Sequence, residues 1–174
     1  MQSTGGLHDA TFHALAGVYG WDRDGRRAAA SAGGDEGPVT EPVPDFSGTL
    51  VGYCDFRVHF RSVVNREHIT FYPDGRTVTR GKLTVALRNT KTEKRIVIDI
   101  SGPILTYPRP HGRTLIVSAA RSAVFLTAQE SGLGHPIFWL VTQGAIRTVG
   151  QPDGSQRLVS YPKDHIVNLC SRLS

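Results

Sequence analysis

The stretch from Gly48 to Phe60, GTLVGYCDFRVHF, is the feature of the sequence that most constrains the fold. Apolar and polar side chains alternate along much of it. A period of two is typical of a half-buried β-strand, because successive side chains of a strand point to opposite faces. The pattern predicts one long strand here and an all-β domain that begins at Gly48. The even-numbered positions include the apolar residues Leu50, Cys54, Phe56, Val58 and Phe60, and the odd-numbered positions include the polar residues Tyr53, Asp55, Arg57 and His59.

Short β-like segments separated by turn residues follow Arg61. Turn signals such as Pro73-Asp74-Gly75 and Gly102-Pro103 divide them at regular spacing. Residues from Asp164 onward fit either a last strand or one helical turn. We therefore expect a single antiparallel β-barrel of about eight to ten strands. The expected strands after the first are 65–72, 76–88, 94–101, 104–107, 113–119, 121–127, 136–143, 145–149 and 156–160.

The first 46 residues differ from the rest in composition and charge. They hold three basic and seven acidic residues, a net charge of −4, whereas residues 47–174 hold the other 17 basic and 8 acidic residues, a net charge of +9. Apolar residues at roughly helical spacing predict a short helix over 8–19, and a Gly-, Ala-, Pro- and acid-rich composition predicts an extended or disordered linker over 22–45. The expected organisation is an N-terminal arm, residues 1–46, before a barrel domain, residues 47–174.

The two cysteines, Cys54 and Cys170, lie near the two ends of the expected barrel. The first and last strands of a closed up-and-down barrel are neighbours, so a disulfide is geometrically possible and would stabilise the fold by roughly 4–5 kcal/mol on the chain-entropy model. The alternative is a pair of buried free thiols, as in cytosolic proteins. The N-terminus lacks the features of a secretory signal, which leaves virion, cytoplasm and extracellular space open as compartments.

Two segments, 123–126 and 137–141, are apolar on both faces of their expected strands. The outer face of a barrel strand should be polar, and a bare apolar patch usually marks an interface. We therefore expect the N-terminal helix or a neighbouring subunit to cover these segments. Phe125, Phe138 and Trp139 are the interface candidates.

A basic set on and beside the expected strand 76–88 is a second candidate surface. Glu93 is the only acid between residues 76 and 95. The set indicates an anionic partner, or a solvated strand edge protected by charge. No aromatic ladder accompanies it, so nucleic acid is not favoured. We expect the acidic arm, from the same chain or a neighbour, to contact Arg80, Lys82 and Arg88. The whole set is Arg76, Arg80, Lys82, Arg88, Lys91, Lys94 and Arg95.

Local catalytic and cofactor motifs are absent from the sequence, so no catalytic, cofactor or metal-binding residue is assigned. There is no phosphate-binding loop, no Cys-x-x-Cys, no His-Glu-x-x-His and no Gly-x-Ser-x-Gly elbow. The polar parity from Tyr53 to His59 suits acid–base chemistry in a polar cavity, but it fits a solvated barrel face as well. No run of 18 apolar residues occurs, so no membrane-spanning helix is expected.

Several short motifs run through the body of the chain. They are Phe46-Ser47-Gly48-Thr49-Leu50 with Cys54 after it, Lys82-Leu83-Thr84 with Leu87 and Asn89-Thr90, Ser101-Gly102-Pro103, Phe125-Leu126-Thr127, and Ile166-Val167 with Cys170. With these motifs, residues 46–172 resemble small uncharacterised β-barrel proteins common in actinobacteria. The resemblance implies a lipocalin-like barrel, often secreted, with no agreed activity.

Three functions compete on this sequence. The first is a non-enzymatic structural or assembly protein that acts through protein–protein contacts, for example an accessory subunit of an actinobacterial phage particle. The second is a barrel that binds an apolar small molecule, and the third is a barrel-type cyclase with an apolar pocket. The arm, the two-faced apolar segments and the missing catalytic motifs favour the first. Its partners would be copies of this chain or other protein subunits.

Overall fold

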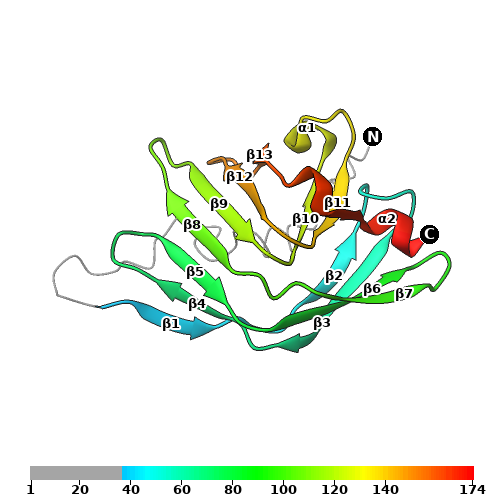
Figure 1. The fold of residues 1–174 in the computed structure, drawn as a ribbon, viewed down its shortest axis with the longest axis horizontal. Coiled ribbons are helices and arrows are strands. Elements are labelled where there is room, and N and C mark those ends of the chain that lie inside the picture. Colours follow the sequence, from blue (N-terminus) through cyan, green and yellow to red (C-terminus); the bar gives the residue numbers. More distant parts are fainter. Residues whose placement is uncertain (1–36) are drawn as a thin grey trace, which may run out of the picture.

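The structure is a computed structural model, and it describes residues 37–174 of the chain (Figure 1). These residues form antiparallel β-sheets with three short helical segments, so the all-β class expected from the sequence is confirmed. The single closed barrel is wrong, because the strands divide into three sheets. The helix expected over 8–19 and most of the linker expected over 22–45 lie outside the described residues.

The largest sheet has seven strands in the order β1-β4-β5-β8-β9-β12-β13. They are β1 (Val39–Pro42), β4 (His68–Phe71), β5 (Thr77–Arg80), β8 (Ile104–Pro108), β9 (Thr114–Ala119), β12 (Ala145–Gly150) and β13 (Gln156–Ser160). A four-stranded sheet holds β2 (Ser47–Leu50), β3 (Val58–Asn65), β6 (Leu83–Asn89) and β7 (Arg95–Asp99) in that order. A three-stranded sheet holds β10 (Ser122–Leu126), β11 (Ile137–Val141) and β14 (Ile166–Asn168). The helical segments are α1 (Ala128–Ser131), the 3-10 turn η2 (Lys163–His165) and α2 (Leu169–Leu173).

Most strands are halves of longer segments that bend and continue in another sheet. β3 continues into β4, β5 into β6, β7 into β8, β9 into β10 and β11 into β12. Two bends require glycine: a Cβ at Gly81 would collide with the carbonyl oxygen of Arg66, and one at Gly102 with the carbonyl oxygen of Ala119. The expected strand 76–88 is therefore two strands in two sheets.

The bends also explain why the barrel does not close. β8 and β9 are paired, and this ladder extends to the hydrogen bond from the Gly102 N–H to the Arg121 carbonyl oxygen at 2.8 Å. Beyond it, β7 stays in the four-stranded sheet while β10 passes into the three-stranded sheet. Within residues 37–174, β1 and β13 are left as the two edges of the seven-stranded sheet.

The long strand expected over Gly48–Phe60 is a hairpin. β2 and β3 pair antiparallel with Leu50 opposite Val58, and residues 51–57 form the connecting loop. Gly52 in this loop has a φ of 87°, a left-handed conformation that glycine tolerates and a strand does not. The alternation continues through the turn because the inward side chains on both arms of the hairpin fall at even-numbered positions.

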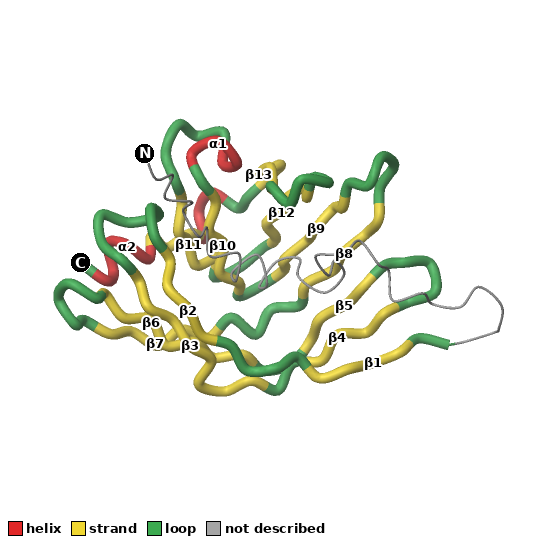
Figure 2. Tube along the Cα trace, turned by 180° about the vertical axis from the view of Figure 1, so that it is seen from behind, coloured by secondary structure: helices red, strands yellow, loops and turns green. Residues whose placement is uncertain are grey.

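The core lies between the four-stranded and three-stranded sheets, which pack face to face (Figure 2). Phe60, Val85 and Ile98 from the first meet Phe138 and Leu140 from the second. The opposite face of the three-stranded sheet forms part of a second apolar cluster. Its members are Val124, Leu126, Ile137, Val141 and Ile146, with Trp139, Leu158 and Tyr161 beside them. The chain's own sheets therefore cover both faces of the two apolar segments.

Candidate protein-binding surface

The outer face of the four-stranded sheet, on the side opposite the core, is the candidate surface. Cross-strand register places Thr49, His59, Arg88 and Arg95 in one row across all four strands. The neighbouring row is Ser47, Arg61, Ala86 and Val97. Side chains of alternate parity, including Phe60 and Leu87, point into the core instead. We call these two rows, together with Val63, the outer face.

Positive charges stand directly opposite one another on the outer face. Arg88 is paired directly with Arg95 across β6 and β7. Like charges in directly opposed positions destabilise a sheet. Glu93 compensates in part, since its carboxylate lies 2.9 Å from the Arg88 guanidinium and 4.0 Å from that of Arg95. One carboxylate serves two guanidiniums, so the row keeps a positive charge.

Asp99, at the end of β7 in the same strand as Arg95 and Val97, is a second carboxylate of this sheet, and it is already engaged. Its oxygen accepts hydrogen bonds from the Ser101 hydroxyl at 2.5 Å and the Ser101 N–H at 3.0 Å. These hydrogen bonds, with the cations Arg121 and Lys82 nearby, lower the pKa of Asp99 below its usual range. Asp99 therefore stays charged, but it faces Ser101 rather than the arginine row.

Exposed valines lie beside these cations. Val97 is 63% exposed and Val63 is 51% exposed. In residues 37–174 the exposed large apolar side chains are six, and three of them belong to this sheet or to the loop after β2: Val51, Val63 and Val97. A face that combines an excess of positive charge with exposed aliphatic side chains suits an acidic protein partner, because it offers both charge and apolar contact. No Phe, Tyr or Trp lies in its two rows, so it lacks the stacking platform of single-stranded nucleic-acid sites.

The structure divides the basic set expected from the sequence. Arg80 lies at the end of β5 in the seven-stranded sheet, Lys82 in the bend, and Arg88 on the outer face. Arg76 lies at the far tip, with its guanidinium 4.0 Å above the Tyr72 ring and 3.2 Å from the Asp74 carboxylate. The outer face adds Arg61 and Val97, which only the pairing of β3, β6 and β7 brings together.

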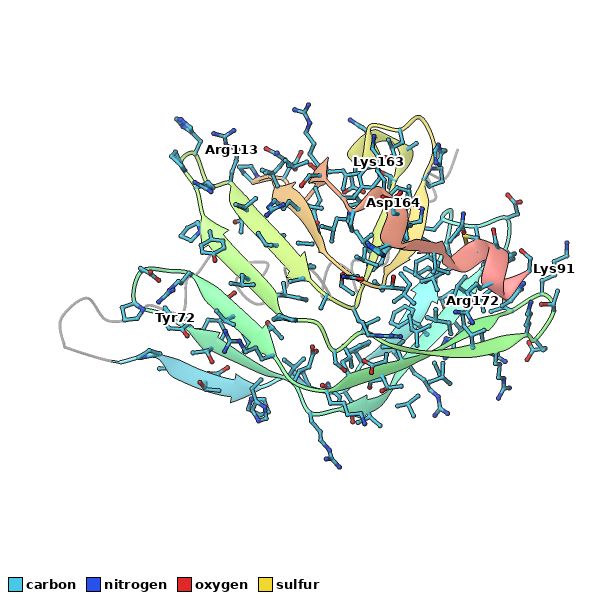
Figure 3. The ribbon with its side chains drawn as sticks, viewed as in Figure 1. Tyr72, Lys91, Arg113, Lys163, Asp164 and Arg172 are labelled. Atoms are coloured by element: carbon cyan, nitrogen blue, oxygen red, sulfur yellow. A yellow bond between two sulfur atoms is a disulfide. The ribbon has the colours of Figure 1, made fainter. Side chains whose placement is uncertain are left out.

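The β6–β7 hairpin carries the remaining lysines towards the C-terminus. Lys94 donates from Nζ to the Ser174 carbonyl oxygen at 2.5 Å. Figure 3 shows Lys91 at the same end of the molecule as Arg172 of α2, with Tyr72 at the opposite end. The basic set therefore extends over the length of the molecule, and Arg88 and Arg95 are its members on the outer face.

The interface candidates Phe125, Phe138 and Trp139 lie inside the fold rather than on a bare surface. Phe138 is only 3% exposed, and the Trp139 ring lies 5.2 Å from that of Tyr161. Phe125 packs edge-on against Tyr53 with ring centroids 5.4 Å apart. Burial, with the negative charge of Glu130, raises the pKa of Tyr53.

The polar residues Tyr53, Asp55, Arg57 and His59 do not share one strand face as the sequence pattern predicts. Tyr53, Asp55 and Arg57 lie in the loop 51–57, whereas His59 lies in β3. Glu67, at the bend between β3 and β4, is the buried acid of the described chain: it is 4% exposed, and burial raises its pKa to about 7. In the described residues, no three His, Cys, Asp or Glu side chains gather as a metal site would require.

The space inside the sandwich is small and apolar. Its cavity has a volume of about 10 Å³, close to that of one water molecule in the same measure. The lining residues are Leu50, Phe60, Val85, Leu87, Ile98, Ile100, Ala123, Phe125 and Phe138. A cavity of this size excludes an organic ligand between the two sheets as they stand.

Cys54 and Cys170 form a disulfide with their Cα atoms 5.5 Å apart. It joins the loop 51–57 to α2, rather than the first and last strands of a barrel. Leu169 and Leu173 of α2 are fully buried in the core, and the Asn89 side chain donates to the Leu173 carbonyl oxygen at 3.0 Å. The disulfide and α2 together close one end of the sandwich.

No protein-family model matches the sequence, and comparison with curated proteins and with solved structures finds no match either. The resemblance to actinobacterial barrel proteins therefore stays a hypothesis. Among the described residues, no helix has the length and apolar character needed to span a membrane.

Proposed function

We propose that the protein is a non-enzymatic structural protein that acts through protein–protein contacts, above all with copies of itself. The observation that carries this proposal is strand β1. It is formed by the last part of the N-terminal arm, it pairs with β4, and all four of its residues are exposed. A strand added at the edge of an open sheet is the element that chains most readily exchange or extend.

The other edge of the same sheet supports the proposal. β13 pairs with β12, and Val159 within it is 56% exposed. The Gln156 N–H at its start is occupied, because it donates to the Glu130 carboxylate at 2.9 Å. The exposed side chains of this edge strand are Arg157 and Val159. An open edge that carries exposed apolar side chains favours pairing with another chain.

The two alternatives, a carrier of an apolar small molecule and a barrel-type cyclase, receive less support. Both need an interior pocket that buries a ligand, and such pockets measure roughly 300–1,000 Å³. The space between the packed sheets is far below this range.

The test is the molar mass of the full-length protein in solution, measured by sedimentation at roughly 0.05 M and 1 M salt over a range of protein concentrations. We expect an oligomer that loses mass at high salt, because the arm is acidic and the body basic. Deletion of residues 1–42, which removes β1, should abolish it. A monomer under all conditions, or an oligomer unchanged by the deletion, would contradict the proposal.

A further inference from the structure

We propose that the outer face of the four-stranded sheet is the docking surface for the acidic N-terminal segment of a second copy of this chain. This inference rests on the proposed function and names the surface and the segment that meet. Its first support is the outer face itself. Arg88 stands directly opposite Arg95, and Glu93 neutralises only part of their charge. An approaching carboxylate relieves this repulsion.

The second support is charge complementarity within the sequence. The arm carries a net charge of −4 and the body +9. Asp35 and Glu36 are adjacent acids just before β1, and no basic residue follows them until Arg57. Two neighbouring carboxylates match the two arginines, Arg88 and Arg95, that share the single Glu93.

The third support is the place where the arm leaves the sheet. Val39, the first residue of β1, pairs with Phe71 at the tip of β4, whereas Pro42 pairs with His68 beside the end of β3. Val39 therefore lies at the end of β1 that is farther from the four-stranded sheet (Figure 1).

This geometry allows Asp35 and Glu36 to reach the outer face of a second copy, but not that of their own chain. Asp35 is four residues from Val39, so it reaches at most about 14 Å from the start of β1. Arg61 and Phe71 are separated by ten residues of β3 and β4, about 30 Å along the strands at roughly 3.3 Å per residue. The acidic pair thus falls short of its own outer face by a wide margin, and the same face on a neighbour has no such limit.

The partner is a protein segment rather than a copy of the same face. Two outer faces that stacked on each other would bring their arginines together, and like charges oppose that contact. The exposed Val63 and Val97 give an extended segment apolar contact beside the charges.

The experiment is a charge swap in the full-length protein, read as the dissociation constant of the oligomer from sedimentation at low salt. The face variant is Arg61→Glu with Arg95→Glu, and the arm variant is Asp35→Lys with Glu36→Lys. Each alone should weaken association at least about tenfold. The two combined in one chain should restore it, because the charges are then complementary again. Arg109→Glu with Arg113→Glu is the matched control. It makes the same change in net charge on exposed side chains of the β8–β9 loop and should leave association unchanged.

The outcomes separate this inference from the proposed function. If the wild-type protein forms an oligomer that the deletion of residues 1–42 abolishes, but the face variant associates as well as the control, the docking surface is wrong and the assembly function stands. If the combined swap fails to restore association, the pairing of this face with this segment is also wrong. A wild-type protein that is monomeric throughout overturns both.

Discussion

Glu67 shows at the scale of one residue how the fold controls a charge. The side chain is 4% exposed at the bend from β3 to β4, and burial raises its pKa from 4.5 to about 7. The folded protein therefore keeps Glu67 protonated up to about pH 7, whereas the unfolded chain ionises it from about pH 4.5. Stability contributed by the neutral form is complete below about pH 4.5 and is lost as the pH rises through 7.

Glu67→Gln tests this titration. The variant removes the charge but keeps the shape, so it should match the wild type near pH 4.5 and exceed it at pH 8. The expected gain in the free energy of unfolding is roughly 1–3 kcal/mol. The measurement is urea unfolding at intervals from pH 4.5 to 8. Parallel stability curves for the two proteins would show that Glu67 ionises freely in the folded state.

Ser122 makes a second prediction at this scale. Its hydroxyl is buried at the start of β10 and has no hydrogen-bond partner among residues 37–174. An unsatisfied buried hydroxyl costs about 1–3 kcal/mol, so Ser122→Ala should be neutral or stabilising in thermal unfolding. Ser101→Ala is the contrasting variant, because the Ser101 hydroxyl donates to Asp99 and accepts from the Leu83 N–H at 3.0 Å. It should lower the melting temperature, and an equal loss in both variants would argue against this reading of Ser122.

At the scale of the element, the bends decide the architecture. Gly81 has a φ of 142°, and a Cβ there would strike the backbone of Arg66 and Glu67. Gly81→Ala should therefore destabilise the fold by about 2 kcal/mol or more, since both the left-handed backbone and the collision oppose it. Gly37→Ala is the control, because no atom of the described part of the chain lies within 4 Å of a Cβ added at Gly37. The check is a pair of chemical denaturation curves, and equal midpoints would contradict the prediction.

The local sequence predicts the buried faces of the strands, but not the bends between sheets. Leu83, Val85 and Leu87 are buried as their parity predicts, because parity is a local property of a strand. Gly102 has the sequence signature of an ordinary turn glycine, and Gly81 lies inside the expected strand 76–88, although both glycines stand where the chain passes from one sheet into another. Whether a glycine ends a strand or bends it depends on the backbone that packs against it. For Gly81 this is the backbone of Arg66, and for Gly102 that of Ala119, and the local pattern contains neither.

Only part of the candidate surface can be predicted from the sequence, for a related reason. Arg88 stood out in a run of basic residues, and so did Arg95. Arg61 and Val97 join it only through the pairing of β3, β6 and β7, which connects residues far apart in the chain. Register of this kind depends on non-local packing, so the composition of one segment does not reveal it.

At the scale of the whole molecule, the disulfide is the longest covalent constraint. Cys54 and Cys170 are separated by 116 positions, so the crosslink closes almost the whole described chain into one loop. On the chain-entropy model such a loop destabilises the unfolded state by about 4–5 kcal/mol. Cys54→Ser with Cys170→Ser should lower the melting temperature by roughly 10–20 °C, and a reductant should do the same to the wild type.

The double serine variant also serves as the control for the reductant, since it has no bond left to reduce and should melt identically with and without it. The position of α2 distinguishes two ways in which the disulfide could stabilise the fold. Leu169 and Leu173 are fully buried in the core, so we expect the helix to stay docked in the variant at low temperature. If the variant already shows a wild-type melting temperature, burial of the two leucines is enough to close this end of the sandwich. If it melts early but keeps the wild-type near-ultraviolet circular dichroism below its transition, the disulfide acts on the unfolded chain rather than on the position of α2.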